Sequence, residues 1–159
     1  MTIRLDIGSG LAPLPGYFTV DPYIPTADYH DQMWNLVSFE DNSVDEIFSS
    51  HSLEHIAQAQ VLPTLLEWKR VLKIGGKITI RVPDLEWCVE RWLKTRSVGW
   101  DMAIIFGNQN HEGEFHKTGF TTAIMLKYLK EAKLRPLVVK KLFTHEQQTL
   151  SFEIIKEKE

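Results

Sequence analysis

Short apolar runs that are rich in β-branched and aromatic residues recur along the chain. Runs of this kind, about four to eight residues long and bounded by Gly, Pro, Asp or Ser, are typical of β-strands. They occur at residues 2–7, 17–20, 44–50 and 76–82, and again near residues 137–143 and 149–155. The last two follow one another so closely that they predict a hairpin-like end.

Apolar residues with helical spacing separate the third and fourth of these strands. The spacing covers residues 61–72 and predicts a helix that begins near Gln60, which keeps Pro63 in the first turn. Gly75 and Gly76 follow, and a left-handed glycine cap is expected to end the helix there. Strand, helix and strand together predict a βαβ unit.

Two further helices are predicted in the second half of the chain. Asp84 is a suitable N-cap for a helix over residues 85–94, and a threonine at 121 or 122 is a suitable cap for another that ends near Ala132. Residues 99–119, between these helices, show no clean period. Long segments of this kind are usually functional, so we expect a loop or lid over the site.

This order of elements predicts one α/β domain over residues 1–159. Strands that alternate with helices and end in a strand pair favour a Rossmann-like three-layer sandwich, whose mostly parallel sheet has an antiparallel strand near one edge. Only residues 8–17 separate the first two strands, and Pro13, Pro15 and Gly16 interrupt them. The first crossover helix is therefore expected to be reduced.

Composition narrows the partners and the compartment. The chain has 159 residues, 25% of them charged, and a formal net charge of -3, so it lacks the basic field that would hold a nucleic-acid backbone. Cys88 is the only cysteine, which excludes an internal disulfide and a cysteine metal cluster. No apolar run approaches the ~18 residues of a membrane span, and no signal segment is recognisable. We therefore expect a cytoplasmic protein that has neither nucleic acid nor membrane as a partner.

Two glycines directly follow the first predicted strand, in the segment LDIGSG at residues 5–10. The carboxyl ends of parallel strands form the ligand crevice of such a sheet, so this loop is a candidate binding site. A tight turn that leaves a strand is the alternative for a lone GxG. Asp21, at the end of the second strand, favours the binding site, because its carboxylate could accept hydrogen bonds from both hydroxyls of a ribose.

The ligand expected at this loop is an adenosine without phosphates. A dinucleotide would need a third glycine and a helix N-terminus beneath its pyrophosphate, but Pro13 stands in the glycine's position. A nicotinamide-dependent oxidoreductase is therefore disfavoured. S-adenosylmethionine meets the requirement, since its adenosine carries a sulfonium and an amino acid.

Four segments in this order, LDIGSG, TVDP, SSHSLEHI and LKIGGKITIRVPDL, resemble the class I S-adenosylmethionine-dependent methyltransferases. The resemblance spans about residues 3–85 and is closest to the short methyltransferase type 11-like proteins, whose glycine loop is followed by LPG, here at residues 14–16. The later segment GEFHKTGFTT extends it to about residue 135. The resemblance implies a Rossmann-like fold, methyl transfer and S-adenosylmethionine as the cofactor.

The resemblance also implies a set of cofactor contacts. Apart from the adenine contact, the expected residues are Asp6, Gly8, Ser9, Gly10, Asp21 and Ser50. The glycine loop would line the methionine side, and Asp21 would hold the ribose. For the adenine amino group the family has an aspartate before a DLPF-like stretch, which carries an apparent extra residue here. Asp31 and Gln32 are both candidates, with Asp31 preferred, and a capping aspartate in a loop is the alternative.

His51, Glu54 and His55 follow the third predicted strand, and in a helix they would share one face that looks toward the transferred methyl. Histidine exchanges a proton near neutral pH, so His51 is a candidate general base or orienting group for the nucleophile. A divalent metal held by Glu54 and the two histidines is a second interpretation. A structural tie between a helix start and its neighbouring loop is a third, and the predicted site includes no metal.

A second polar group lies within the expected lid and consists of His111, Glu112, Glu114 and His116. We expect these residues to close over the substrate, with His116 as a further catalytic candidate. A solvated loop with incidental histidines is the alternative. Trp87 or Trp100 could form a wall of the substrate pocket.

The function predicted from these features is methyl transfer from S-adenosylmethionine to an oxygen or nitrogen of a small molecule, such as a sugar or another metabolite. The alternative is a non-catalytic module that binds S-adenosylmethionine or S-adenosylhomocysteine within a larger assembly. Because the reduced crossover helix leaves one sheet face poorly covered, we also expect a homodimer or a partner protein over that face.

Overall fold

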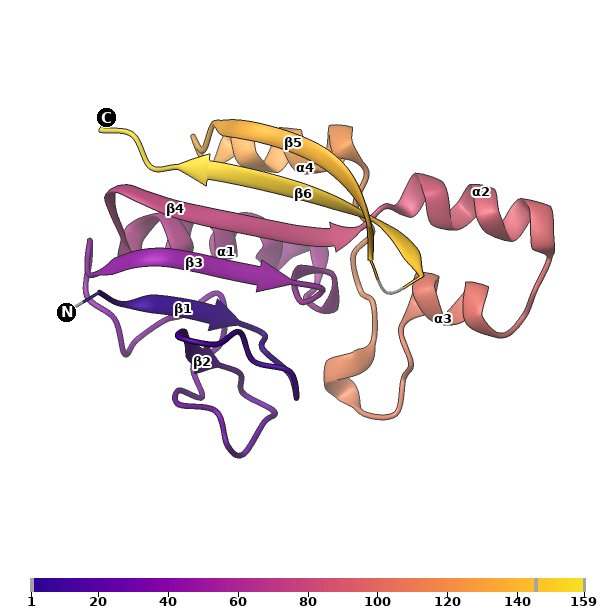
Figure 1. Cartoon of the computed structure of the whole chain (residues 1–159), viewed down its shortest axis with the longest axis horizontal. Helices are drawn as coiled ribbons and strands as arrows, with labels where there is room; N and C mark the ends of the chain where they lie inside the picture. The colour runs from indigo at the N-terminus through magenta and orange to yellow at the C-terminus, as the bar shows by residue number, and fades with distance from the viewer. Residues whose placement is uncertain (1, 145, 159) are drawn as a thin grey trace.

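The computed structural model describes residues 2–144 and 146–158, and its six strands form one sheet in the order β2-β1-β3-β4-β6-β5 (Figure 1). The strands are β1 (Arg4–Ile7), β2 (Phe18–Val20), β3 (Val44–Ser50), β4 (Leu72–Pro83), β5 (Pro136–Thr144) and β6 (Gln147–Ile155). The α-helices are α1 (Gln58–Val71), α2 (Leu85–Thr95), α3 (Trp100–Phe106) and α4 (Thr122–Glu131), and the short 3₁₀ helices are η1 (Leu53–His55) and η2 (Glu112–Glu114).

Strand directions confirm the predicted mixed sheet. Strands β1 to β4 pair in parallel, whereas β6 is antiparallel to both of its neighbours, β4 and β5. Strand β3, helix α1 and strand β4 form the predicted βαβ unit. Residues 8–17 contain no helix, so the chain passes from β1 to β2 without the usual crossover helix. The carboxyl ends of β1, β2, β3 and β4 consequently meet at one edge, where a ligand crevice is expected.

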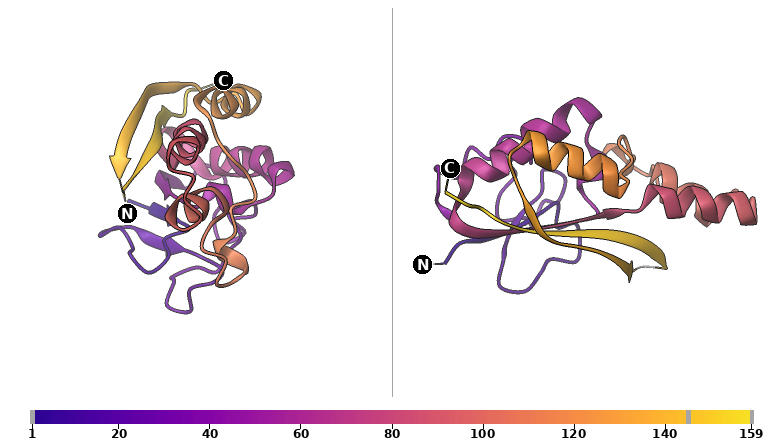
Figure 2. Two further views of the ribbon diagram at one scale, coloured as in Figure 1. Left: turned by 90° about the vertical axis from the view of Figure 1, so that its right-hand side faces the viewer. Right: turned by 90° about the horizontal axis from the view of Figure 1, so that it is seen from above.

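Helices α1 and α4 cover one face of the sheet, and the core lies between them and the strands (Figure 2). Alternate strand residues point to this face, as the two-residue period of a strand requires, and Leu5, Ile47 and Ile80 are fully buried there. Trp68 of α1 is also fully buried, and its indole N–H donates to the carbonyl of Met33 at 2.9 Å. This bond ties the loop after β2 to the helix layer.

The opposite face departs from the expected three-layer arrangement, because among the described residues no helix covers it (Figure 2). The residues on this face are mostly polar, and an arginine guanidinium group lies over each of two aromatic rings. Arg4 lies over the ring of Tyr17 at 5.9 Å, and Arg81 lies over Phe48 at 5.2 Å. The Tyr17 and Phe48 rings contact each other edge to face. A strand face of this composition can be exposed to water. It therefore does not require a homodimer or a partner protein to cover it, and the predicted association stays a prediction.

The junction between α1 and β4 differs from the sequence prediction. Helix α1 begins at Gln58 and ends at Val71, so the glycines do not cap it; β4 starts at the next residue. Gly75 takes a positive φ of 80° within β4, where its amide donates to the carbonyl of Lys156 at 2.8 Å. The conformational freedom of Gly75 is therefore used at an irregular point near the start of β4, not at the end of the helix.

The expected lid is partly helical, since residues 100–106 form α3. Helices α2 and α3 lie together beyond the carboxyl end of β4 (Figure 1). Asp101 of α3 is buried, and it pairs with Arg91 of α2 at 2.6 Å and accepts a hydrogen bond from Thr95. This contact between two helices, rather than local helical propensity, holds α3 in place.

Within the described part of the chain, no helix has both the length and the apolar character needed to cross a membrane. The cytoplasmic location and the single domain over residues 1–159 stay predictions; residues 1, 145 and 159 lie outside the described part.

Candidate functional site

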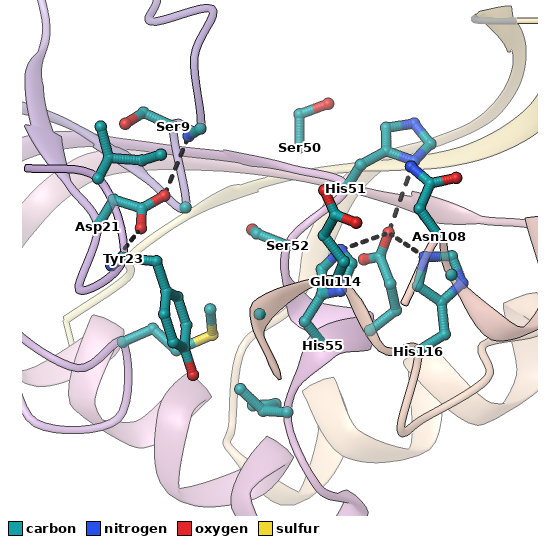
Figure 3. Close-up of a pocket in the computed structure, with 18 of the residues that line it drawn as sticks. Ser9, Asp21, Tyr23, Ser50, His51, Ser52, His55, Asn108, Glu114 and His116 are labelled. Atoms are coloured by element: carbon teal, nitrogen blue, oxygen red, sulfur yellow. Dashed lines mark hydrogen bonds and ion pairs between the residues drawn. The ribbon is translucent and has the colours of Figure 1, made fainter. Parts of the chain in front are cut away.

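A cavity of about 790 Å³ opens at the carboxyl ends of β1, β2 and β3, within the size range of small-molecule sites (Figure 3). Of the residues predicted from the sequence, its lining includes Asp6, Gly8, Ser9, Gly10, Asp21, Gln32, Ser50, His51 and His116. The glycine loop and Asp21 lie at one end of the view, His51, His55 and His116 lie at the other, and Ser50 and Ser52 lie between them (Figure 3). We call these the glycine end and the histidine end.

The glycine loop owes its shape to two positive φ angles. Gly8 has a φ of 71°, its amide donates to the carbonyl of Val20 at 2.8 Å, and a Cβ there would lie 2.3 Å from the Cβ of Ser52. Gly10 has a φ of 56°, but a Cβ there would meet no atom within 4 Å. Gly8 is therefore required for close packing as well as backbone conformation, whereas Gly10 is required for conformation alone.

Asp21 closes the glycine loop onto the end of β2. Its carboxylate, 7% exposed, accepts hydrogen bonds from the amide of Gly10 at 3.0 Å and from the amide of Tyr23 at 2.9 Å, one on each oxygen. A carboxylate has about four lone-pair sites, so acceptor capacity remains for hydroxyl groups in the cavity. The loop and its acidic residue thus form one preorganised unit.

Asp6 and Ser9 add polar groups at the same end. Asp6 accepts a hydrogen bond from the amide of Leu14 at 2.8 Å, and burial, assisted by the charge of Asp21, raises the pKa of its carboxyl above the usual value. The Ser9 hydroxyl is buried and has no hydrogen-bond partner among the described residues. A polar atom of this kind at a cavity wall is suited to a ligand.

The predicted preference for Asp31 as the adenine contact is not supported by the geometry. The Asp31 carboxylate accepts a hydrogen bond from the amide of Ser38 at 2.9 Å, and Asp31 does not belong to the cavity lining. Gln32, with Met33 and Trp34, does line the cavity. Asp31 thus caps its loop, as aspartates in turns commonly do, and Gln32 is the better candidate for the adenine.

His51 directly follows β3 and has a left-handed conformation with a φ of 53°, which is uncommon for a residue other than glycine. Its amide donates to the carbonyl of Arg81 at 2.9 Å. Its ring Nε2 lies 3.1 Å from the hydroxyl of Thr149, and its Nδ1 lies 3.6 Å from the carboxylate of Glu54. The backbone turn thus places an imidazole into the cavity between two polar neighbours.

Glu54 is the centre of the histidine end. It is only 2% exposed, and the Nε2 atoms of His55 and His116 each lie 4.0 Å from its Oε1 (Figure 3). Burial alone would raise the pKa of this carboxyl, but His51, His55 and His116 together hold it below its usual value. The group is therefore a buried carboxylate that three imidazoles surround.

The segments that meet here are distant in sequence. The carbonyl of Glu54 accepts hydrogen bonds from the amides of Lys117 and Thr118, at 2.8 and 3.1 Å, which brings His116 beside it. The predicted common face on one helix is wrong, because His51 belongs to the strand end whereas Glu54 and His55 belong to η1. Burial lowers the pKa of the His116 ring, which favours a neutral imidazole.

Residues from both halves of the lid line the cavity. His111 and Glu114 line the cavity with His116, and the His111 ring lies 5.9 Å from that of Tyr23 across the opening. Glu112 instead pairs with Lys117 and is not part of the lining. Of the two tryptophans proposed for a pocket wall, Trp100 lines the cavity, whereas Trp87 packs on Phe143.

The polar lining residues that were not identified from the sequence include Arg81, Asn108 and Gln147. Arg81 and Gln147 each have a buried polar side-chain atom without a hydrogen-bond partner in the described structure, and Asn108 follows α3. A polar residue near the end of a buried strand could have pointed to Arg81. Gln147 gave no such signal, because the hairpin between β5 and β6 alone brings it to within 3.5 Å of His51.

The sheet order, the glycine loop after the first strand and the acidic residue at the end of the second strand define the fold of the class I S-adenosylmethionine-dependent methyltransferases. The model of the methyltransferase domain family matches residues 20–80 of this chain. No curated protein matches the sequence.

Solved structures share the fold over nearly the whole chain. An S-adenosylmethionine-dependent methyltransferase from Methanosarcina mazei has a TM-score of 0.70 at 18% identity, covering 98% of this chain and 92% of its own. A possible histamine N-methyltransferase from Thermotoga maritima has a TM-score of 0.68 at 17% identity, with coverages of 99% and 83%. The 1,6-didemethyltoxoflavin-N1-methyltransferase of Burkholderia thailandensis, solved with its substrate and S-adenosylhomocysteine, has a TM-score of 0.68 at 16% identity, with coverages of 98% and 71%.

At these identities the likeness establishes the fold. Together with the family match over residues 20–80, it supports the predicted methyltransferase class, whose cofactor is S-adenosylmethionine.

Proposed function

We propose that the glycine end of the cavity binds S-adenosylmethionine and that the histidine end receives a small-molecule acceptor. The observation that carries this proposal is the position of Asp21, whose carboxylate holds the glycine loop and borders a cavity that continues to His51. Asp21 would accept hydrogen bonds from the ribose hydroxyls, and Gln32 would contact the adenine. Gly8, Ser9 and Gly10 would line the path of the methionine portion.

Methyl transfer to a hydroxyl or amine moves the methyl carbon from sulfur to the acceptor atom, leaves S-adenosylhomocysteine and releases one proton. The bound cofactor supplies the activated methyl group. The protein is then required to hold the acceptor in line, about 3–3.5 Å from the carbon, and to take up the proton. His51 is suited to this step, because its imidazole lines the cavity and its Nδ1 lies 3.6 Å from the carboxylate of Glu54.

His116 has a different role in this proposal. His116 belongs to the lid segment, and its Nε2 lies 4.0 Å from the carboxylate of Glu54. With the lid over the acceptor, this imidazole would orient the acceptor. Residues of mixed character wall this end, among them Trp100, Asn108 and Glu114, which suits a compact acceptor with both ring or alkyl surface and polar atoms. The substrate bound in the Burkholderia methyltransferase of the same fold supports a small molecule as the class of acceptor.

Calorimetric titration with S-adenosylhomocysteine tests the proposal. Wild-type protein should bind it, and Asp21→Ala should weaken binding about 100-fold, because hydrogen bonds to a charged partner are worth about 1.5–3 kcal/mol. Asp28→Ala is the matched control: Asp28 follows the same strand and also accepts hydrogen bonds from Thr19, but it lies outside the cavity. Its affinity should equal that of the wild type.

Absence of binding by the wild type, or equal loss in both variants, would contradict the proposal. Tight binding without turnover in a broad acceptor screen would instead support a non-catalytic cofactor-binding module.

A further inference from the structure

Three side chains at the histidine end have the chemistry and the proximity of metal ligands. The ligand atoms of Glu54, His55 and His116 all lie within 4.8 Å of one another, and they come from η1 and from the lid segment. Ion pairs of 4.0 Å join the Nε2 atoms of His55 and His116 to Oε1 of Glu54, and in Figure 3 the dashed lines from these two imidazoles meet at one carboxylate oxygen. Two histidines and one carboxylate form a ligand set that protein zinc sites use with a further position open to a reactant.

The His55 imidazole is oriented by a backbone group, as metal-binding histidines usually are. Its Nδ1 lies 3.2 Å from the carbonyl of Phe115. When Nδ1–H of His55 donates to that carbonyl, the neutral ring directs the lone pair of Nε2 at Glu54. A hydrogen bond that fixes the tautomer in this way is the common outer support of a metal ligand.

The carboxylate itself is unsatisfied. Among the described residues neither oxygen of Glu54 has a hydrogen-bond partner, although the side chain is only 2% exposed. Leaving a buried charged group without hydrogen bonds is strongly unfavourable. The Nε2 atoms of the two imidazoles and an anionic oxygen therefore face one another around a common point, an arrangement that a cation at that point would stabilise.

We propose that Glu54, His55 and His116 bind a divalent transition-metal ion, with zinc as the best match to this ligand set. Ligand atoms at ~2.0–2.1 Å from a tetrahedral ion lie about 3.3 Å apart, so the three groups need to approach one another by roughly 1 Å. The remaining coordination position faces the cavity.

The position of the site gives it a consequence for the acceptor. An oxygen or nitrogen atom of the acceptor could occupy the open coordination position, which would lower its pKa and hold it at the histidine end. The acceptor would then belong to the class of small molecules with a metal-ligating hydroxyl or amine. This consequence rests on the proposed function, whereas metal binding itself does not require the cofactor.

The test is a titration of tag-free, chelator-treated full-length protein with Co²⁺, followed by its visible absorption. Cobalt in a site of low coordination number absorbs visibly, and zinc added afterwards should displace it and bleach the signal. One ion should bind per chain. Glu54→Gln and His116→Gln should each weaken binding by more than about 10-fold, the lower end of what even outer-sphere changes produce.

His111→Gln is the matched control, because it removes an imidazole that also lines the cavity. The Nε2 of His111 lies 3.6 Å from a different carboxylate, that of Glu114. Its affinity for Co²⁺ should equal that of the wild type. Circular dichroism checks that each variant folds, and His55→Gln, which alters a partly exposed ligand, replaces any variant that does not. Absence of a Co²⁺ signal in the wild type, or equal affinity in all variants, would overturn the proposal, even if S-adenosylhomocysteine binds as expected.

Discussion

The two ends of the cavity are built in different ways. The glycine end comes from β1, β2 and the loops that follow them. Backbone amides of the same stretch satisfy the carboxylates of Asp6 and Asp21, although the neutral hydroxyl of Ser9 has no partner among the described residues. The histidine end joins residues 51–55 to the lid and the β5–β6 hairpin, and it keeps buried polar atoms of Glu54 and Gln147 without hydrogen-bond partners among the described residues.

This difference separates a preformed site from one that awaits a ligand. Satisfied polar groups hold a fixed shape, which suits a cofactor that the whole class shares. Unsatisfied buried groups favour a bound species that completes them. Variants of the two ends should therefore change different measured quantities.

The largest expected effect is on turnover at the histidine end. His51→Asn removes the proton acceptor while asparagine tolerates the left-handed backbone that this position requires. With a hydroxyl acceptor, kcat should fall about 10²- to 10⁴-fold, the usual contribution of a general base, whereas the Kd of S-adenosylhomocysteine should stay within about twofold. Rates of S-adenosylhomocysteine formation and calorimetry measure the two quantities. An unchanged kcat would remove His51 from the mechanism.

The next effect is on stability at the glycine end. Gly8→Ala should destabilise the fold by about 2–5 kcal/mol, because the left-handed backbone contributes about 1–2 kcal/mol and overpacking against Ser52 about 1–3 kcal/mol. Gly10→Ala carries only the backbone penalty, about 1–2 kcal/mol. Urea unfolding of both variants provides the comparison. Equal losses would show that Ser52 yields to the added methyl group.

The smallest effect separates two neighbouring residues after β2. Gln32→Ala should weaken S-adenosylhomocysteine binding about 2- to 10-fold, which corresponds to one neutral hydrogen bond of about 0.5–1.5 kcal/mol. Asp31→Ala should leave the Kd unchanged, because its carboxylate serves the amide of Ser38. Calorimetry on the pair decides the assignment, and the opposite ranking would restore Asp31 as the adenine contact.

Local patterns were enough to predict much of the fold and of the glycine end. Strand β3 has the predicted bounds, and Asp84 accepts a hydrogen bond from the amide of Glu86 as the N-cap of α2. Thr121 likewise caps α4 through the amide of Ile124. The glycine loop and Asp21 follow strands that the residue pattern identifies, so their meeting at one sheet edge follows from parallel pairing alone.

Features that depend on distant contacts could not be predicted in this way. Helix α3 is short and relies on the pair of Arg91 and Asp101, which the periodicity of its own residues does not reveal. The central place of Glu54 depends on the bonds between its carbonyl and the lid segment. Asp31 and Gln32 are adjacent in the sequence. Which of the two lines the cavity depends on the direction of the backbone in a loop that has no repeating pattern.

The central claim, that the cofactor occupies the glycine end and leaves the histidine end free, is tested most directly by amide chemical shifts. Isotope-labelled protein would be titrated with S-adenosylhomocysteine and its backbone amides followed by NMR. The account predicts the largest shifts at Gly8, Gly10 and Tyr23, with His55 and Lys117 nearly unchanged. Largest shifts at His55 and Lys117, with a silent glycine loop, would contradict it.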